Sequence, residues 1–265
     1  MTSNTAQDTV SRIAEALDAA RQAIARFVPG AVEATEKPGG RGPLTEADQI
    51  GNRVLREMLP RAGEGWLSEE SVDDLARLKA RRVWVVDPLD GTNEFIAGVP
   101  EWCISVAMVE DGLATAGGIV NPVTGEVIVG SRETGVTANG KTVRVTMRQG
   151  LLGAVILASR SEVARGEWDR FRDAPFSIRP TGSVAYKLAR VAAGLADATW
   201  TLTCKNEWDV AAGAALVEAA GGFVLGVDGS PLRFNQASTL LPGLMAGGMG
   251  LRDELMAFLR PHRSG

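Results

Sequence analysis

Histidine is almost absent from this chain. Its 265 residues include a single histidine, His262, in the short tail Pro-His-Arg-Ser-Gly. Catalysis by a Ser-His-Asp or Cys-His arrangement needs an imidazole base, which the rest of the chain does not supply. If the protein is an enzyme, carboxylates or metal ions must therefore carry the acid-base chemistry.

Cysteine is also scarce. Cys103 and Cys204 are far apart in the sequence and do not form a disulfide framework, so we expect two reduced thiols. Residues 1–5 lack the basic and apolar regions of a signal peptide, and no apolar run approaches the ~18 residues of a membrane span. We therefore expect a cytoplasmic protein that makes no membrane contact.

An excess of basic charge is missing as well. The 28 Lys and Arg residues are outnumbered by 32 Asp and Glu residues, which gives a net charge of -4. Such a chain has no overall positive field to attract a nucleic-acid polymer or an anionic membrane, so we expect a small-molecule partner. A hydrophobic content of 45% is sufficient for one large or two modest domains.

The first part of the chain combines helical and strand patterns. Apolar residues at helical spacing predict a helix over 5–27, and the Gly- and Pro-rich stretch 36–43 indicates a loop. A second helix should start at Thr45, which forms the pattern of a capping box with Asp48. Apolar runs bounded by turn signals predict strands at 66–68, 83–86, 103–109, 115–120 and 127–129, of which the last three form an antiparallel sheet.

After Gly150 strands and helices alternate, which is typical of an α/β architecture. The patterns predict strands at 155–159, 198–202 and 222–224 and helices at 183–193, 208–220 and 251–259, with a Gly-rich loop over 243–250. We therefore expect an N-terminal α+β subdomain over residues 1–150 and a C-terminal α/β subdomain over residues 151–265.

One stretch matches a nucleotide-binding motif in sequence but not in its structural context. Residues 135–142, Gly-Val-Thr-Ala-Asn-Gly-Lys-Thr, fit the P-loop pattern of nucleotide-binding proteins. A P-loop leads from a strand into a helix, whereas Asn139-Gly140 is a tight-turn signal and residues 143–145 alternate like a strand. We therefore interpret this stretch as a hairpin rather than as a nucleotide site.

The chemistry is concentrated after the strand at 83–86. That strand leads into Asp87-Pro88-Leu89-Asp90-Gly91-Thr92. Pro88 keeps Asp87 extended, and we expect the chain to turn directly afterwards so that both carboxylates face one point. Gly91 and Thr92 at a helix start offer backbone N–H groups to phosphate oxygens.

Further carboxylates occur at the ends of other predicted elements. Glu69 and Glu70 follow a strand, and Asp209 starts a helix. Taken singly, the glutamates could be a solvated loop pair and Asp209 an ordinary charge at a helix N-terminus. Gathered at one place, they would repel one another unless cations lay among them, and oxygen ligands without His or Cys favour Mg²⁺ over Zn²⁺.

Four motifs together resemble those of the inositol monophosphatase superfamily of Mg²⁺-dependent, typically Li⁺-sensitive phosphatases. The two longer ones are Asp87 to Thr92 and Trp208-Asp209-Val210-Ala211-Ala212-Gly213 with Glu218 to Gly222. The two shorter ones are Glu69-Glu70-Ser71 and Thr45-Glu46-Ala47-Asp48. The resemblance runs from about Lys37 to Gly222, and it implies an α/β fold built as a layered αβαβα sandwich, often dimeric.

The resemblance also implies roles for individual residues. The ligands of two or three Mg²⁺ ions would be Glu69, Asp87, the Leu89 carbonyl, Asp90 and Asp209. Glu69 and Thr92 would orient the attacking water, and Asp48, with Glu70 beside it, would support a further Mg²⁺. Gly91, Thr92 and Asp209 would contact the substrate, and Lys37 falls where the family often has a lysine in a mobile loop. A capping box remains a sufficient local explanation for Asp48.

The substrate is less strongly indicated than the reaction. Inositol phosphatases of the family usually carry a glutamate seven residues before the last aspartate, and Leu202 stands there. The stretches 90–95 and 207–209 are more similar to the 3′(2′),5′-bisphosphate nucleotidase branch, which removes the 3′-phosphate of 3′-phosphoadenosine 5′-phosphate. The alternatives are a phosphatase for inositol 1-phosphate or another polyol, sugar or histidinol phosphate, and a non-catalytic protein that binds Mg²⁺ or phosphate metabolites.

Overall fold

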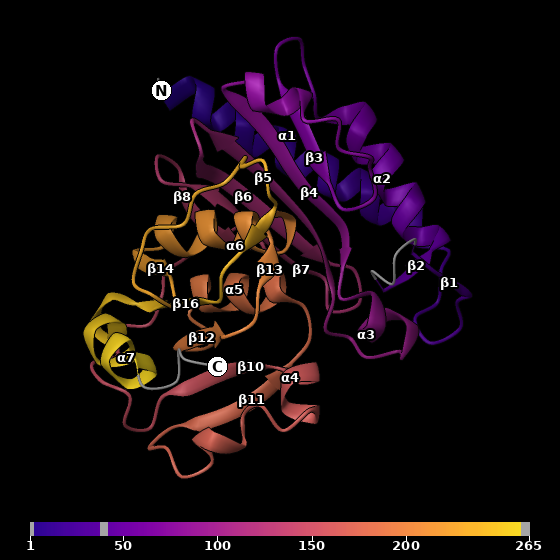
Figure 1. Ribbon diagram of the computed structural model, residues 1–265. Helices are drawn as coiled ribbons and strands as arrows, with labels where there is room; N and C mark the ends of the chain where they lie inside the picture. Colours follow the sequence, from indigo (N-terminus) through magenta and orange to yellow (C-terminus); the bar gives the residue numbers. More distant parts are fainter. Residues whose placement is uncertain (1–2, 38–41, 261–265) are drawn as a thin grey trace.

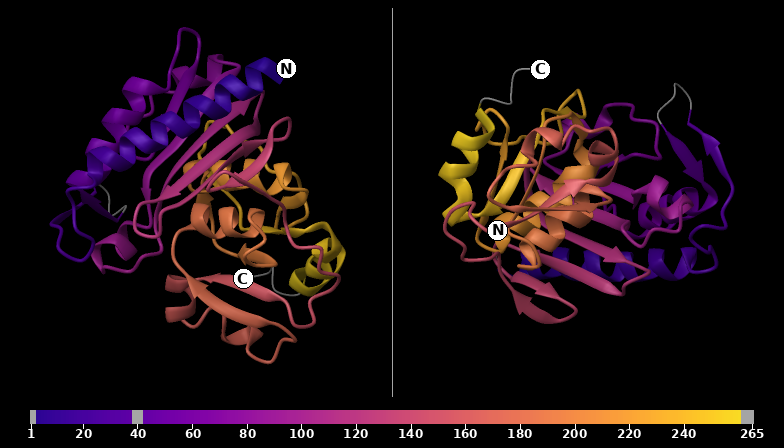
Figure 2. Two further views of the ribbon diagram at one scale, coloured as in Figure 1. Left: turned by 180° about the vertical axis from the view of Figure 1, so that it is seen from behind. Right: turned by 90° about the horizontal axis from the view of Figure 1, so that it is seen from below.

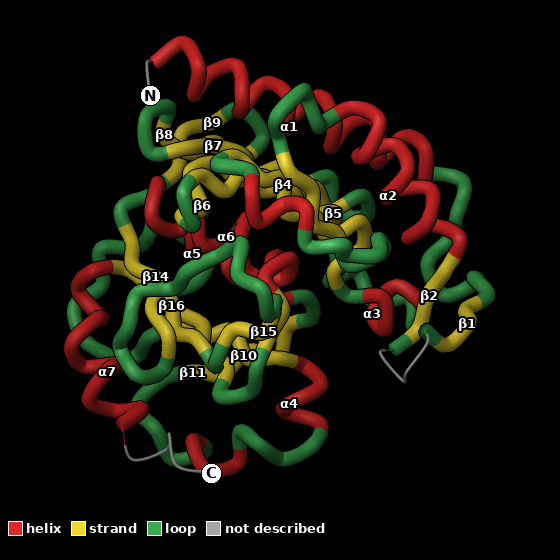
Figure 3. Tube along the Cα trace, turned by 45° about the horizontal axis from the view of Figure 1, so that its top comes forward, coloured by secondary structure: helices red, strands yellow, loops and turns green. Residues whose placement is uncertain are grey.

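A computed structural model describes residues 3–37 and 42–260. Five layers alternate along the molecule (Figure 1): two long helices, a seven-stranded sheet, two central helices, a five-stranded sheet, and short outer helices. Figure 3 shows the same order, with helices outside and between the two sheets. The predicted α/β fold with an αβαβα sandwich is confirmed. His262 lies outside the described residues.

The first sheet contains the predicted antiparallel hairpins. Its strands follow the order β3-β4-β5-β6-β7-β8-β9, and only β3 and β4 are parallel neighbours. The strands are β3 (Gly65–Ser68), β4 (Arg82–Asp90), β5 (Cys103–Glu110), β6 (Leu113–Asn121), β7 (Glu126–Ser131), β8 (Gly135–Ala138) and β9 (Lys141–Val143). A short 3-10 turn, η1 (Ala76–Lys79), lies between β3 and β4.

The hairpin of β8 and β9 settles the question of the P-loop pattern. Asn139 and Gly140 have φ angles of 47° and 77°, as a type I′ turn requires. The lysine of the pattern, Lys141, is an exposed residue of β9 rather than part of a helix start. The hairpin interpretation is therefore confirmed.

Two helices cover the outer face of this sheet (Figure 2). They are α1 (Ser3–Ile24) and α2 (Glu46–Met58), and α1 buries Ile13 and Leu17 completely against the strands. Between them, β1 (Ala34–Glu36) pairs with β2 (Pro43–Thr45), so the expectation of a loop over 36–43 was partly wrong. Residues 38–41 of that loop lie outside the described part of the chain.

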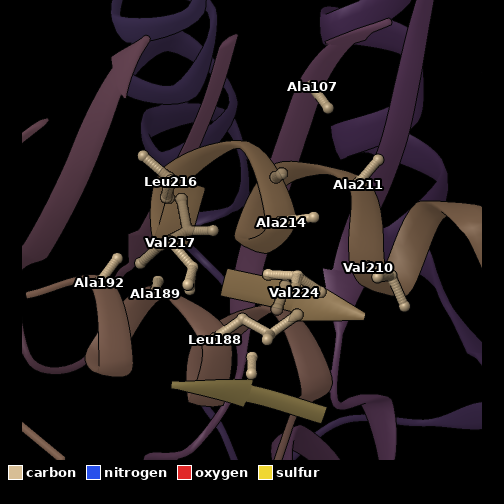
Figure 4. Packing of buried hydrophobic residues seen from close by; sticks show 14 of the residues in the cluster. Ala107, Leu188, Ala189, Ala192, Val210, Ala211, Ala214, Leu216, Val217 and Val224 are labelled. Carbon is tan, nitrogen blue, oxygen red and sulfur yellow. The ribbon is translucent and has the colours of Figure 1, made fainter. Parts of the chain in front are cut away.

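The central layer consists of α5 (Val184–Ala192) and α6 (Glu207–Ala219). Their side chains form one apolar cluster that also includes residues from both sheets (Figure 4). The two helices come very close, because a Cβ atom added at Gly213 would lie 2.3 Å from the Cβ of Leu188. Any larger residue at position 213 would push the helices apart.

The second sheet is mixed rather than purely parallel. Its order is β11-β10-β12-β16-β14, where β10 pairs in parallel with both neighbours and β16 antiparallel with both. The strands are β10 (Val155–Ser159), β11 (Ser177–Thr181), β12 (Ala198–Thr201), β14 (Gly222–Gly226) and β16 (Leu244–Gly248). A separate pair, β13 (Lys205–Asn206) and β15 (Leu240–Leu241), adjoins the start of α6.

Two strands of this sheet were not predicted. The expected loop over 243–250 was wrong, because residues 244–248 form the buried strand β16. Its glycines suggested a turn, but Gly248 needs the space: a Cβ there would lie 2.4 Å from the carbonyl of Thr146. Strand β11 was missed because it is a half-exposed edge strand that contains Pro180, which a central strand would exclude.

The outermost layer is made of short elements around an aromatic cluster. These are α4 (Arg160–Ala164), η2 (Asp169–Phe171), η3 (Met249–Leu251) and α7 (Arg252–Leu259). Trp168 stacks on Trp200 with ring centroids 4.7 Å apart, and Phe171 meets Trp200 edge-on at 5.4 Å.

The chain passes from the first sheet to the second between β9 and β10. The predicted subdomain boundary near Gly150 falls within this connection and stays a prediction.

Candidate active site

Three aspartates meet at the edge between the first sheet and the central helices. Asp87 and Asp90 belong to β4 and Asp209 to the first turn of α6, and one carboxylate oxygen from each lies within 4.8 Å of the others. Asp87 and Asp90 are buried, with exposures of only 1% and 8%. The structure therefore brings together residues separated by more than a hundred positions in the chain.

A bulge in β4 explains how two aspartates three positions apart reach the same point. Asp87 is paired with Ser105, and Asp90 with Cys103, so three steps along β4 correspond to two steps along β5. In a regular strand, residues three apart point to opposite faces, and one extra residue corrects this. The predicted turn directly after Asp87 was wrong, because the strand continues to Asp90.

Asp90 is held by the start of α5. Its Oδ2 accepts hydrogen bonds from the Ser183 hydroxyl at 2.6 Å and from the Ala185 backbone N–H at 2.7 Å. Ser183 has a φ of 56°, an unusual value for a residue with a side chain. The strained position places its hydroxyl between Asp90 and the Tyr186 N–H, which it caps at 3.0 Å.

Asp209 is held by a capping box, a local motif that the sequence carries as Asn-x-x-Asp. Its Oδ2 accepts the backbone N–H of Asn206 at 3.0 Å, and Asn206 is the N-cap of α6. This contact uses one carboxylate oxygen and leaves Oδ1 available to a ligand in the site. The prediction that Asp209 lies at a helix start is confirmed.

The electrostatics of the three aspartates favour a cation. Burial raises the pKa of Asp87 and Asp209 well above the usual range, and repulsion by Glu69 and Asp90 adds to it. Burial likewise raises the pKa of Asp90, although the hydrogen bonds from Ser183 and Ala185 oppose the shift. A divalent ion among these oxygens would remove the repulsion, and hard oxygen donors suit Mg²⁺.

Glu69 and Glu70 lie beside this cluster and share one lysine. Lys37 is buried and places its Nζ 2.6 Å from a carboxylate oxygen of each glutamate. Burial lowers the pKa of Lys37, but the two ion pairs outweigh it and raise the value overall. Burial raises the pKa of Glu70 to about 7 despite the lysine. Lys37 is thus the present counter-charge of both glutamates.

Thr92 connects the acidic cluster to α2. Its hydroxyl lies 3.3 Å from Asp48 Oδ1 and 3.2 Å from the Leu89 carbonyl, and its single hydrogen can serve one of them at a time. Asp48 is fully buried and completes the predicted capping box with Thr45. Thr92 opens the short helix α3 (Thr92–Ile96), and Gly91 before it has a φ of 102°, which only glycine adopts without strain.

The three aspartates open into a cavity of about 230 Å³, which Lys37, Glu69 and Thr92 also line. Its wall includes residues that the sequence analysis did not single out, from β10, α4, α5 and β13: Ser159, Ser161, Ser183, Lys187 and Lys205. Asn93 and Glu94, which belong to the stretch 90–95, also line it, whereas Leu202 packs against the aromatic cluster.

Two lysines give a positive charge to the part of the cavity wall that β10, α4, α5 and β13 form. Lys187 is buried, and its Nζ donates to the Ser183 carbonyl at 2.8 Å. Burial lowers its pKa to about 8, against the attraction of Asp90. Lys205 is fixed by Glu162 at 3.1 Å. The one feature of the sequence that could have marked Lys187 as a site residue is its position among the apolar residues of α5.

A comparison with known families agrees with this arrangement. Residues 3–256 match the model of the inositol monophosphatase family. The chain belongs to this family. The predicted phosphoric monoester hydrolase is thereby confirmed, and the family in general depends on Mg²⁺, for which the three aspartates form a chemically suitable site.

Named relatives in the family differ in substrate. The chain is 34% identical over 201 residues to inositol-1-monophosphatase of Rhizobium meliloti, covering 71% of this chain and 75% of the relative. It is 36% identical over 208 residues to 3′-phosphoadenosine 5′-phosphate phosphatase of Mycobacterium bovis, covering 75% and 74%. The crystal structure of extragenic suppressor protein suhB from Bartonella henselae superimposes with a TM-score of 0.77 at 28% identity, over 94% of this chain and 97% of that one.

Proposed function

We propose that this phosphatase removes the 3′-phosphate of 3′-phosphoadenosine 5′-phosphate. One observation carries the proposal: the cavity with the acidic cluster also contains Lys187 and Lys205. The acidic cluster, loaded with metal, would bind the phosphate that is cleaved. Two lysines in the same small cavity suit a second anionic group on the substrate, which inositol 1-phosphate does not have.

We assign the metal ligands as the resemblance implies. Two Mg²⁺ ions would be held by Glu69, Asp87, the Leu89 carbonyl, Asp90 and Asp209, with Asp48 and Glu70 supporting a third. Bound there, Mg²⁺ would lower the pKa of a water molecule and offset negative charge on the phosphoryl group. Lys37 would then exchange part of its pairing with Glu69 and Glu70 for the ions.

The protein's own groups would orient the reactants. Glu69 and Thr92 would direct a water molecule toward the 3′-phosphorus, and the Thr92 hydroxyl could pass a proton toward Asp48. Burial raises the pKa of Asp48, although hydrogen bonds from Thr45 oppose it, so the carboxylate is suited to accept a proton when no third ion is bound. The backbone N–H groups of Gly91 and Thr92 would bind phosphate oxygens. The products are inorganic phosphate and adenosine 5′-phosphate.

The second anionic group would contact the lysine side of the cavity. Lys187 Nζ donates one hydrogen to the Ser183 carbonyl, which leaves two for a ligand. The hydroxyls of Ser159 and Ser161 lie 3.0 Å from one another and line the same wall. The relative from Mycobacterium bovis, named for 3′-phosphoadenosine 5′-phosphate, is consistent with this assignment.

Hydrolysis of inositol 1-phosphate is the second candidate, and the Rhizobium relative favours it. Against it, Leu202 cannot form the hydrogen bond to a ring hydroxyl that a glutamate would provide. The non-catalytic alternative would require the acidic cluster to have lost its function, although all of its carboxylates are present.

The decisive experiment measures phosphate release from 3′-phosphoadenosine 5′-phosphate, inositol 1-phosphate and histidinol phosphate side by side with Mg²⁺. We expect the highest kcat/KM for the first substrate. A higher value for inositol 1-phosphate would favour the second candidate, and no release from any of the three would favour the binding protein.

A cytoplasmic location and a homodimer are further parts of this proposal. No helix among the described residues is long and apolar enough to cross a membrane. Light scattering on the purified protein would determine whether it is a dimer.

A further inference from the structure

The helix α6 begins with two acidic residues that have different partners. Asp209 belongs to the acidic cluster, whereas Glu207 is completely buried and binds the segment 235–236. Its Oε2 accepts the backbone N–H of Asn235 at 2.6 Å, and its Oε1 accepts that of Gln236 at 2.8 Å. Both oxygens of a buried carboxylate are thus committed to two successive amides, and the proposed reaction does not use this residue.

Arg77 holds the same two residues through their other groups. Its Nη1 donates to the Asn235 side-chain carbonyl at 2.8 Å and its Nη2 to the Gln236 backbone carbonyl at 2.9 Å. Asp73 fixes the guanidinium at 2.8 Å. Arg77 is buried, so these charge-assisted hydrogen bonds are shielded from water. We call Glu207, Arg77, Asn235 and Gln236 the clamp.

The clamped segment is continuous with the strand that supports the start of α6. Thr239 accepts the Glu207 backbone N–H at 2.8 Å, and its hydroxyl donates to the Asn206 side-chain carbonyl at 3.2 Å. Leu240 pairs with Asn206 in the β13–β15 ladder. Asn206 is also the residue whose backbone N–H orients Asp209, so a displacement of the segment would be transmitted to that carboxylate.

We infer that Glu207 and Arg77 are positioning residues for metal binding, which hold Asp209 within reach of Asp87 and Asp90. Arg77 lies on the same connection as Glu69 and Glu70, between β3 and β4. The clamp therefore joins the part of the chain that carries these glutamates to the helix that carries Asp209. The inference rests on the proposed role of Asp209 as a metal ligand.

The first test is Glu207→Gln, which keeps the shape of the side chain but replaces one acceptor by an N–H donor. That donor would face a backbone N–H, so the segment must shift. We expect the Mg²⁺ concentration for half-maximal activity to rise about tenfold, as for other partners of metal ligands. The kcat at saturating Mg²⁺ should stay within about twofold, because excess metal restores the liganded geometry.

Glu218→Gln is the matched control, because it makes the same change at the other end of α6, where Glu218 pairs with Arg132 on the surface. It should leave the Mg²⁺ dependence unchanged. A purely structural role of Glu207 would lower the melting temperature or kcat without moving the Mg²⁺ dependence, and that result would overturn the inference.

A second variant covers the possibility that Glu207→Gln does not fold. Asn235 has a φ of 56°, which glycine adopts freely, so Asn235→Gly removes only the two side-chain bonds to Arg77, one accepted from Nη1 and one donated to the Arg77 carbonyl at 3.4 Å. We expect a smaller rise in the required Mg²⁺ concentration, about threefold. An unchanged Mg²⁺ dependence in this variant would also contradict the clamp.

Asp209→Asn, measured in parallel by calorimetric Mg²⁺ titration, separates this inference from the proposed function. Wild-type Mg²⁺ binding by Asp209→Asn would overturn the proposed ligand set and the clamp with it. Loss of Mg²⁺ binding in Asp209→Asn, with unchanged binding in Glu207→Gln and Asn235→Gly, would overturn the clamp alone.

Discussion

The two halves of the cavity differ in charge and in origin. The acidic half comes mainly from one continuous stretch, β4 and the start of α3, joined by Glu69 and Asp209. The lysine half is assembled from β10, α4, α5 and β13, and none of its residues belongs to the four recognised motifs. The proposed function divides the labour accordingly: it assigns the reaction to the acidic half and the choice of substrate to the lysine half.

The largest effect should come from removing a charge in the acidic half. Asp90→Asn keeps an oxygen that can accept from Ser183 and Ala185, but it removes the negative charge of a proposed metal ligand. We expect Mg²⁺-dependent phosphate release to fall by a factor on the order of 10³ for every substrate, because several kcal/mol of charge stabilisation are lost.

The control for this prediction is Asp111→Asn, an exposed aspartate that pairs with Arg81 and does not line the cavity. It should retain wild-type turnover. Circular dichroism should show that Asp90→Asn is folded, and full activity of a folded Asp90→Asn protein would refute the metal assignment.

A smaller and substrate-dependent effect should follow from a change in the lysine half. Lys187→Met keeps the length of the side chain without its charge. We expect kcat/KM for 3′-phosphoadenosine 5′-phosphate to fall about 30-fold, the value of one or two charged hydrogen bonds, with inositol 1-phosphate affected much less. Equal losses of kcat/KM for both substrates would contradict the proposed division of labour.

Arg190→Met provides the comparison on the same helix. Arg190 stacks over Tyr186 and does not line the cavity, so its loss should affect the two substrates equally.

The pH dependence should distinguish the two halves more finely. Burial lowers the pKa of Lys187 to about 8, and only its protonated form attracts an anion. As the pH rises through this value, kcat/KM for the bisphosphate should fall, by about tenfold between about pH 7 and about pH 9. Initial rates at low substrate concentration measure this, and Lys187→Met should lack the decline. A decline of equal size in the variant would assign it to another group.

The smallest effect is expected outside both halves. Lys141→Ala alters the lysine of the P-loop pattern, which lies exposed on β9. Phosphate release should change by less than about twofold, as for most surface substitutions. A large loss measured in the same assay would revive the nucleotide-binding interpretation of residues 135–142.

Features that depend only on neighbouring residues could be predicted from the sequence alone. The capping box of Thr45 and Asp48, the hairpin turn at Asn139 and the strand leading to Asp87 could all be predicted, because each depends on contacts within a few positions. The scarcity of histidine and the oxygen-rich motifs likewise indicated Mg²⁺ chemistry before any distance was known.

The tertiary structure decided the features that depend on distances between elements. The bulge that turns Asp90 toward Asp87 comes from pairing with β5, and the burial of β16 comes from its place between β12 and β14. Lys187 and Lys205 lie in the cavity only because α5 and α6, the helix that β13 leads into, pack against β4, which no local pattern records. Backbone preferences act over a few residues, whereas the position of a charge in a site is fixed by packing across the whole chain.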